Sequence, residues 1–203
     1  MRTILLLVFI CLPGLVWAED MAVSHRVIVV GEVLRGTFSE ERQLKEFKAP
    51  LRSTGHFIVA PGHGLIWSVE TPFSITTVIT PSGLMQETGG NQTMNLPAQR
   101  IPFLLNLYDM LCGALAGDWT ALSQQFTISK SGDDAHWQAL LSPLKKDDTS
   151  MPFSSIRATG GQFVEQIELH KEDGDADILT FSNQKLSTSP LTAREIAMLT
   201  LNQ

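Results

Sequence analysis

Charged residues, cysteine and tyrosine are scarce in this 203-residue chain. Charged residues make up 18% of it, the two cysteines are Cys11 and Cys112, and there is a single tyrosine. Two cysteines exclude a disulfide framework and a cysteine-rich metal site. The 43% of hydrophobic residues is too high for a disordered chain. The formal net charge is −6, whereas proteins that bind nucleic acid usually carry an excess of basic residues. Composition therefore predicts one soluble globular domain, or at most two small ones, and argues against binding of nucleic acid.

Sequence motifs of catalysis and metal binding are also missing. There is no Gly-x-Ser-x-Gly turn and no glycine-rich loop leading into a Lys-Ser/Thr pair. Asp173, Asp175 and Asp177 have the spacing of a calcium loop, but Ile178 and Gln184 stand where such a loop needs Gly and Glu. The sequence predicts no enzyme, no metal and no cofactor.

The first eighteen residues have the pattern of a secretion signal. Arg2 precedes an apolar run that is short for a membrane span, and Ala18 ends a small-residue cleavage pattern. Cleavage there leaves residues 19–203 as a single exported domain. Only Cys112 then remains, so we expect no internal disulfide.

Most of the predicted domain has the alternating pattern of β-strands. Residues 38–83 alternate with a period of two, interrupted by Pro and Gly, and later strands are expected at 125–130, 136–141, 162–169 and 178–182. Asp173-Gly174 between the last two indicates a tight hairpin. These features favour an antiparallel sheet. The polar residues 87–95 are expected to form a mobile loop.

Three segments favour helices. Residues 101–116 carry apolar side chains at helical spacing on most of the helix surface, so this helix must be covered. Thr192 and Glu195 have capping-box spacing at the start of a short helix over residues 192–199. Residues 20–33 fit a weaker helix, although residues 27–30 also fit a strand.

The predicted strands place bulky apolar side chains on one face of the sheet. A curved antiparallel sheet can enclose a ligand cavity when its inward face is apolar and its interior is not filled. The same pattern also fits a solid core completed by the helix of residues 101–116. The pattern alone leaves both interpretations open. The inward candidates are Phe38, Phe57, Leu65, Trp67, Phe73 and Ile75.

An ordered series of short segments resembles the LolA-type outer-membrane lipoprotein carrier family of Gram-negative periplasms. The series runs from Gly36 to Asn183 and covers most of the predicted mature chain. Its main segments are Gly36-Thr37-Phe38, Pro50-Leu51-Arg52-Ser53-Thr54-Gly55-His56-Phe57, Pro61-Gly62-His63-Gly64-Leu65-Ile66-Trp67, Thr71-Pro72-Phe73, Leu115-Ala116-Gly117-Asp118, Leu141-Ser142-Pro143, Ile167-Glu168-Leu169, Asp173-Gly174-Asp175 and Phe181-Ser182-Asn183.

The resemblance implies a fold and a function. The fold is mainly β with α: an incomplete antiparallel β-barrel, or half-barrel, whose apolar concave face is covered by helices. The function is that of a monomeric periplasmic carrier, which shields acyl chains of lipoproteins or of a glycolipid between an inner-membrane exporter and an outer-membrane acceptor. The alternative is a non-catalytic periplasmic assembly module with a filled barrel. A hydrolase would need a nucleophile and a base, which the sequence does not offer.

The resemblance also implies a site. The family's cavity-lining aromatic falls on Trp67, and Leu65 and Val69 share its strand face. A family arginine that helps to hold the lid shut is replaced here by Ala60, before Pro61. This departure leaves the closing mechanism and the cargo open. The full set of cavity and lid candidates is Phe38, Phe57, Leu65, Trp67, Val69, Phe73, Ile75, Leu104, Leu107, Leu111 and Leu115.

Overall fold

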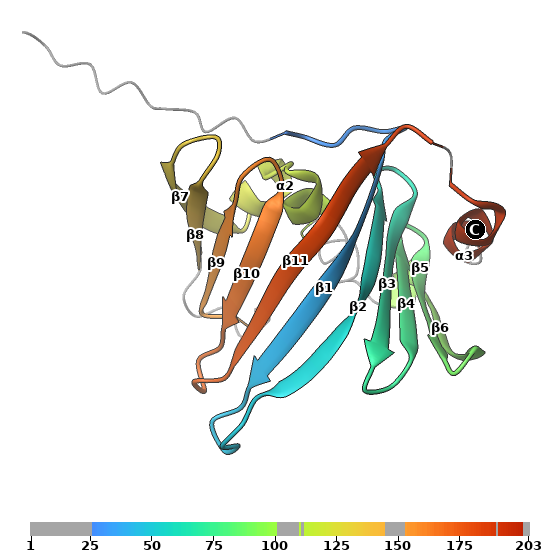
Figure 1. The fold of residues 1–203 in the computed structure, drawn as a ribbon, viewed down its shortest axis with the longest axis horizontal. Coiled ribbons are helices and arrows are strands. Elements are labelled where there is room, and N and C mark those ends of the chain that lie inside the picture. Colours follow the sequence, from blue (N-terminus) through green and yellow to red (C-terminus); the bar gives the residue numbers. More distant parts are fainter. Residues whose placement is uncertain (1–25, 101–109, 111, 145–152, 190, 201–203) are drawn as a thin grey trace, which may run out of the picture.

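The fold is one eleven-stranded antiparallel sheet that does not close into a barrel (Figure 1). The computed structural model describes residues 26–100, 110, 112–144, 153–189 and 191–200. The strand order is β6-β5-β4-β3-β2-β1-β11-β10-β9-β8-β7, so β6 and β7 are the edges. The strands are β1 (Val33–Gln43), β2 (Leu51–Ala60), β3 (Gly64–Thr71), β4 (Ile75–Thr80), β5 (Gly83–Thr88), β6 (Asn91–Pro97), β7 (Phe126–Gly132), β8 (Trp137–Pro143), β9 (Ser155–Gly160), β10 (Val164–His170) and β11 (Ala176–Ser187).

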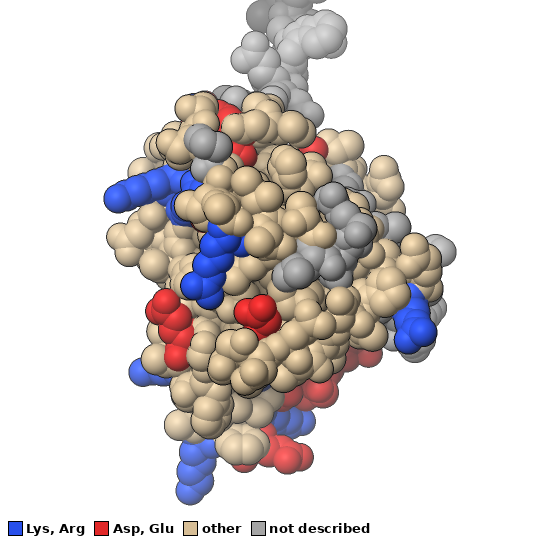
Figure 2. Space-filling model, turned by 90° about the vertical axis from the view of Figure 1, so that its right-hand side faces the viewer, with Lys and Arg blue, Asp and Glu red and all other residues tan. Residues whose placement is uncertain are grey.

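Helical segments in the described part are short. They are the 3₁₀ turn η1 (Ala98–Arg100), α2 (Thr120–Ser123) and α3 (Ala193–Thr200), and residues 110 and 112–116 are helical as well. No helix among the described residues is long and apolar enough to cross a membrane. The side of the molecule on the right of Figure 1, where α3 lies, shows scattered charges and no continuous basic patch (Figure 2).

The two faces of the sheet carry separate hydrophobic cores. Successive side chains of a strand point to opposite faces, and on β1 Leu34 belongs to one core while Val33 belongs to the other. On β3 the same holds for Leu65 and Ile66. We call the face that carries Leu34 and Leu65 the inner face, and the opposite one the outer face. Helix α3 covers part of the outer face through Leu199.

Two registers link distant parts of the sequence. Strand β1 pairs with β2 on one side and with β11 on the other, so the N-terminal and C-terminal strands meet at the centre of the sheet. A glycine on β1 permits close packing there: a Cβ at Gly36 would lie 2.6 Å from the ring of Phe57. The pairing of β1 with β11 brings side chains from the two ends of the sequence together on the inner face.

Several sequence predictions are confirmed by the described residues. Strands are present at each of the expected later positions, and β10 and β11 form a hairpin in which Gly174 has φ +92°. The capping box is formed: the Thr192 amide donates to Glu195 Oε2 (2.6 Å), and the Glu195 amide donates to Thr192 Oγ1 (3.3 Å). The expected helix of residues 101–116 is seen at 110 and 112–116. Its remainder and the signal segment 1–18 lie outside the described residues.

Two predictions of secondary structure are wrong. Residues 87–95, expected to be a mobile loop, form the end of β5, a turn at Gly89 and Gly90, and the start of β6. Strand β6 has a neighbour on one side only and is mostly exposed, so it needs no apolar alternation. Within the segment 20–33, residues 26–32 form neither a helix nor a strand, and β1 begins at Val33.

An ion pair fastens α3 to the outer face. Arg35 on β1 donates two hydrogen bonds to the Glu195 carboxylate, from Nη2 (2.8 Å) and Nε (3.1 Å). The Arg35 hydrogen bond lowers the pKa of Glu195 below its ordinary value, and the backbone hydrogen bond from Thr192 lowers it further.

This lowered pKa predicts an acid-sensitive attachment. A carboxyl whose folded-state pKa is depressed contributes stability above its unfolded pKa of about 4.3 and loses that stability as the pH falls through the folded value. Wild type should therefore exceed Glu195→Gln in Tm at pH 7, and the difference should shrink as the pH falls from about 5 to 3. Thermal unfolding of both proteins across this range measures it. A Tm difference independent of pH would contradict the assignment.

Candidate functional site

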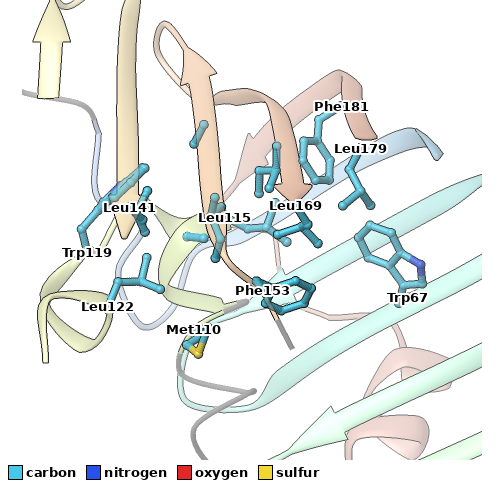
Figure 3. A pocket seen from close by; sticks show the side chains of 14 residues that line it. Trp67, Met110, Leu115, Trp119, Leu122, Leu141, Phe153, Leu169, Leu179 and Phe181 are labelled. Carbon is cyan, nitrogen blue, oxygen red and sulfur yellow. The ribbon is translucent and has the colours of Figure 1, made fainter. Parts of the chain in front are cut away.

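An apolar cavity lies between the inner face and the helical residues that cover it (Figure 3). Its volume is about 110 Å³, and all the described side chains that line it are apolar. One wall comes from strands β8 to β11, including Leu141, Ile167 and Phe181. Leu115 belongs to the helical residues 112–116, and Trp67 contributes from β3. Because β3 and β8 stand six places apart in the strand order yet line one cavity, the sheet curves around it.

A small side chain, Ala158, helps to explain why space is left in this wall. Ala139 on β8 and Ala158 on β9 are direct cross-strand partners, and both are buried on the inner face. Ala158 lines the cavity, with the larger Ile156 as its neighbour on the same face. Tightly packed interiors leave few voids. Ala158 is therefore the small residue of the β8 to β11 wall and leaves space there, whereas Ala139 is buried in the core without lining the cavity.

Trp67 belongs to a cluster of four aromatic rings, together with Phe38, Phe57 and Phe181. Phe57 and Trp67 are cross-strand partners, as are Phe38 and Phe181. Trp67 stacks on Phe38 with ring centroids 3.8 Å apart and meets Phe181 edge to face at 6.2 Å. Aromatic pairs in these geometries add stability beyond the area they bury. The cluster therefore holds the Trp67 ring in one orientation, with one side toward the cavity.

The far end of the cavity is closed by a second aromatic group. Trp119 lines the cavity and packs edge to face on Trp137, with ring centroids 5.5 Å apart. The Lys130 ammonium lies 4.8 Å from the centre of the Trp119 ring. Burial lowers the pKa of Lys130. This cation–π contact supports Trp119 from outside the cavity and places no charge among the lining side chains.

The structure divides the residues proposed from the sequence into four groups. Trp67 and Leu115 line the cavity. Phe38, Phe57 and Leu65 are buried in the inner-face core behind the lining, and Val69 packs against that core. Ile75 is half-buried at the start of β4, whereas Phe73 is 73% exposed. Leu104, Leu107 and Leu111 lie outside the described residues.

The expected inward orientation of Phe73 is wrong. This residue lies in the turn between Thr71, which ends β3, and Ile75, which begins β4. The turn interrupts the alternation of side chains. The two-residue period that points Trp67 and Val69 to the inner face therefore does not apply to Phe73. The aromatic ring therefore faces solvent.

Sequence reasoning missed the wall formed by β8 to β11. Strands β8, β10 and β11 were predicted and β9 was not, and the alternation of Trp137, Ala139 and Leu141 was a readable signal for one apolar face. The sequence could not show that this face meets Trp67, because that meeting depends on the long-range pairing of β1 with β11. The lining residues missed in this way include Leu141, Ile156, Ala158, Ile167, Leu169, Leu179 and Phe181, together with Trp119 and Leu122 of the cover.

Residues 22–178 match the family described as "Outer membrane lipoprotein carrier protein LolA-like". The chain belongs to this LolA-like family. No curated protein matches it by sequence. Among solved structures, it is similar to a LolA superfamily protein, NE2245, from Nitrosomonas europaea. That likeness has 10% identity and a TM-score of 0.44, and it covers 81% of this chain and 90% of the other.

Two further solved structures belong to the same comparison. One is MucB of Pseudomonas aeruginosa in complex with MucA, at 11% identity and a TM-score of 0.39, covering 80% of this chain and 54% of MucB. The other is a putative outer membrane lipoprotein-sorting protein domain from Vibrio parahaemolyticus, at 7% identity and a TM-score of 0.39, covering 80% and 88%. The family assignment of the LolA-like chain rests on the sequence match over residues 22–178.

Proposed function

We propose that this LolA-like chain is a non-enzymatic periplasmic carrier, which shields acyl chains of lipoproteins or of another acylated lipid in the cavity beneath Trp67. The observation that carries the proposal is the lining itself, in which every side chain that the structure describes is apolar. An acyl chain in water costs about 0.8 kcal/mol for each exposed methylene, so a carrier needs an apolar enclosure rather than catalytic groups. The family match over residues 22–178 supports the same function.

The size of the cavity sets how cargo enters. An apolar cavity of about 150 Å³ holds a molecule the size of benzene. The space of about 110 Å³ found here therefore accommodates only the end of an acyl chain. Loading must widen the cavity by moving its cover away from the sheet. The carrier would receive cargo from an inner-membrane exporter and deliver it, as a monomer, to an outer-membrane acceptor.

The closing mechanism differs from that implied by the family resemblance. Ala60 stands where the resemblance places the lid arginine, and it is buried in the outer-face core next to α3. A basic side chain at this position would enter a packed apolar cluster on the side of the sheet away from the cavity. The chain therefore closes its cavity by apolar contacts, such as that of Leu115, rather than by an arginine at position 60.

Fluorescence quenching tests the proposed function directly. Trp67 and Trp119 line the cavity, so a fatty acid brominated along its chain should quench tryptophan fluorescence saturably, while the unbrominated acid of equal length competes without quenching. A brominated short-chain acid of the same headgroup controls for collisional quenching. The absence of saturable quenching with every long-chain acid would contradict the carrier proposal.

A further inference from the structure

We infer that four charged residues at one end of the inner face form a headgroup site, which binds the anionic group of an amphiphile whose acyl chain occupies the cavity. The residues are Glu40, Arg42, Lys171 and Asp177, and we call them the charged rim. The inference rests on the proposed function. It adds that the cargo has an anionic headgroup and that this headgroup lies at the charged rim.

The register of three neighbouring strands places the charged rim directly beside the cavity. Leu179 on β11 lines the cavity, and Asp177 lies two residues earlier on the same strand face. Asp177 is the cross-strand partner of Leu169 on β10, another lining residue, and of Arg42 on β1. Along the inner face of β11, the side chains therefore change from apolar at Leu179 to charged at Asp177.

The two carboxylates of the charged rim are fully engaged by their neighbours. Asp177 accepts a hydrogen bond from Arg42 Nε at Oδ1 (2.9 Å), and its Oδ2 lies 3.2 Å from Lys171 Nζ. Glu40 accepts hydrogen bonds from Arg42 Nη2 (3.0 Å) and from the Ser53 hydroxyl (2.9 Å). All four carboxylate oxygens thus have a cationic or hydroxyl partner.

The two cations retain donors and face solvent more than the carboxylates do. A guanidinium has five N–H donors and an ammonium has three, and the contacts above use two of Arg42 and one of Lys171. The exposed fractions of the side chains are 48% for Arg42 and 25% for Lys171, against 19% for Glu40 and 9% for Asp177. The surface offered to a ligand is therefore cationic, although the four charges sum to zero.

This chemistry favours an acceptor-rich anionic headgroup such as a phosphate or a carboxylate. Hydrogen bonds from guanidinium and ammonium groups to such oxygens are the strong class, because both partners are ionised. A chain that enters the cavity from this end would run from Leu179 toward Trp119, with its headgroup held at Arg42 and Lys171. The carboxylates of the charged rim hold both cations in place before cargo arrives.

The experiment compares two lipids that share an acyl chain and a glycerol unit and differ in one phosphate. Binding of myristoyl lysophosphatidic acid and of monomyristoyl glycerol is measured below their critical micelle concentrations. Wild type should bind the phosphate lipid about tenfold more tightly, the gain expected of one charge-assisted hydrogen bond. Glycerol 3-phosphate, which has the headgroup without the chain, should not displace either lipid at matched concentration.

Substitutions of Arg42 and Lys171 test whether the charged rim causes the preference for the phosphate lipid. Arg42→Gln and Lys171→Gln should each bring the affinity ratio of the two lipids toward one and leave monomyristoyl glycerol affinity unchanged. Lys171→Gln keeps the Arg42–Asp177 contact and so remains informative if Arg42→Gln fails to fold. Arg52→Gln is the matched control, since Arg52 is 71% exposed and pairs with Glu41 away from the charged rim.

Each remaining outcome overturns a specific claim. Equal affinity of wild type for the two lipids, or a preference that survives both substitutions, would overturn the headgroup site and leave the carrier proposal standing. Binding of glycerol 3-phosphate as tight as that of the lysolipid would show an anion site independent of the cavity, which also overturns the inference. Failure of wild type to bind either lipid would overturn the proposed function and this inference with it.

Discussion

Ala158→Leu is expected to reduce acyl-chain binding at least about tenfold while the protein becomes no less stable. Ala158 points into the cavity from β9, and a leucine there would occupy space that cargo needs. Each methylene buried in existing space contributes about 0.8 kcal/mol, so the free energy of unfolding should rise by about 1 kcal/mol after some loss to imperfect fit. Denaturant unfolding and the brominated-acid titration give the two quantities on one sample.

Ala176→Leu is the matched control for this substitution. Ala176 is also a buried alanine, on β11, and it does not line the cavity. Overpacking at a buried alanine costs about 1–3 kcal/mol, and acyl affinity should stay unchanged in the folded fraction because Ala176 does not line the cavity. If Ala158→Leu instead lost stability as Ala176→Leu does and kept its binding, the space at Ala158 would not be the cargo site.

Trp67→Glu is expected to abolish measurable acyl binding. A carboxylate among apolar side chains either stays charged at high cost or takes up a proton, and both states oppose an acyl chain. The same change removes the stacking contact with Phe38, so the free energy of unfolding should fall by about 3 kcal/mol. Most small domains would survive that loss in a folded state. Circular dichroism with the quenching titration separates the two effects.

Two further variants complete this test. Trp67→Phe keeps an apolar ring in the wall and should retain acyl affinity within about threefold. Phe73→Glu changes an aromatic that the sequence pattern placed inward and the structure places 73% exposed, so it should leave affinity unchanged. Loss of binding in Phe73→Glu equal to that in Trp67→Glu would show that the turn, and not the cavity, contacts cargo.

Local sequence signals predicted much of the fold. The alternation along β3, the Asp173-Gly174 hairpin and the Thr192–Glu195 capping box each depend on residues close in sequence, and each is present. Edge strand β6 gave no such signal, because one unpaired side and exposure on both faces remove the need for apolar alternation. Strand β9 follows a polar stretch and was not predicted.

The candidate site was predictable only in part, for a physical reason. The resemblance identified Trp67, and the alternation of β3 gave its strand face. The opposite wall depends on which strands become neighbours. The pairing of Phe38 with Phe181 joins β1, the first strand, to β11, the last one. The hollow also depends on where Ala158 lies, which is set by the pairing of β9 with β8 and β10. Local patterns in a single sequence do not show which distant strands pair.

The most direct test of the carrier claim is native mass spectrometry of the protein purified gently from a periplasmic fraction, followed by lipid extraction of any bound mass. We expect an added mass that corresponds to an acylated molecule and that is lost from Ala158→Leu prepared in the same way. The mass would also distinguish lipoprotein from glycolipid cargo. A wild-type protein that carries no lipid and also fails to take up added long-chain acids would contradict the account and favour an assembly module with a filled interior.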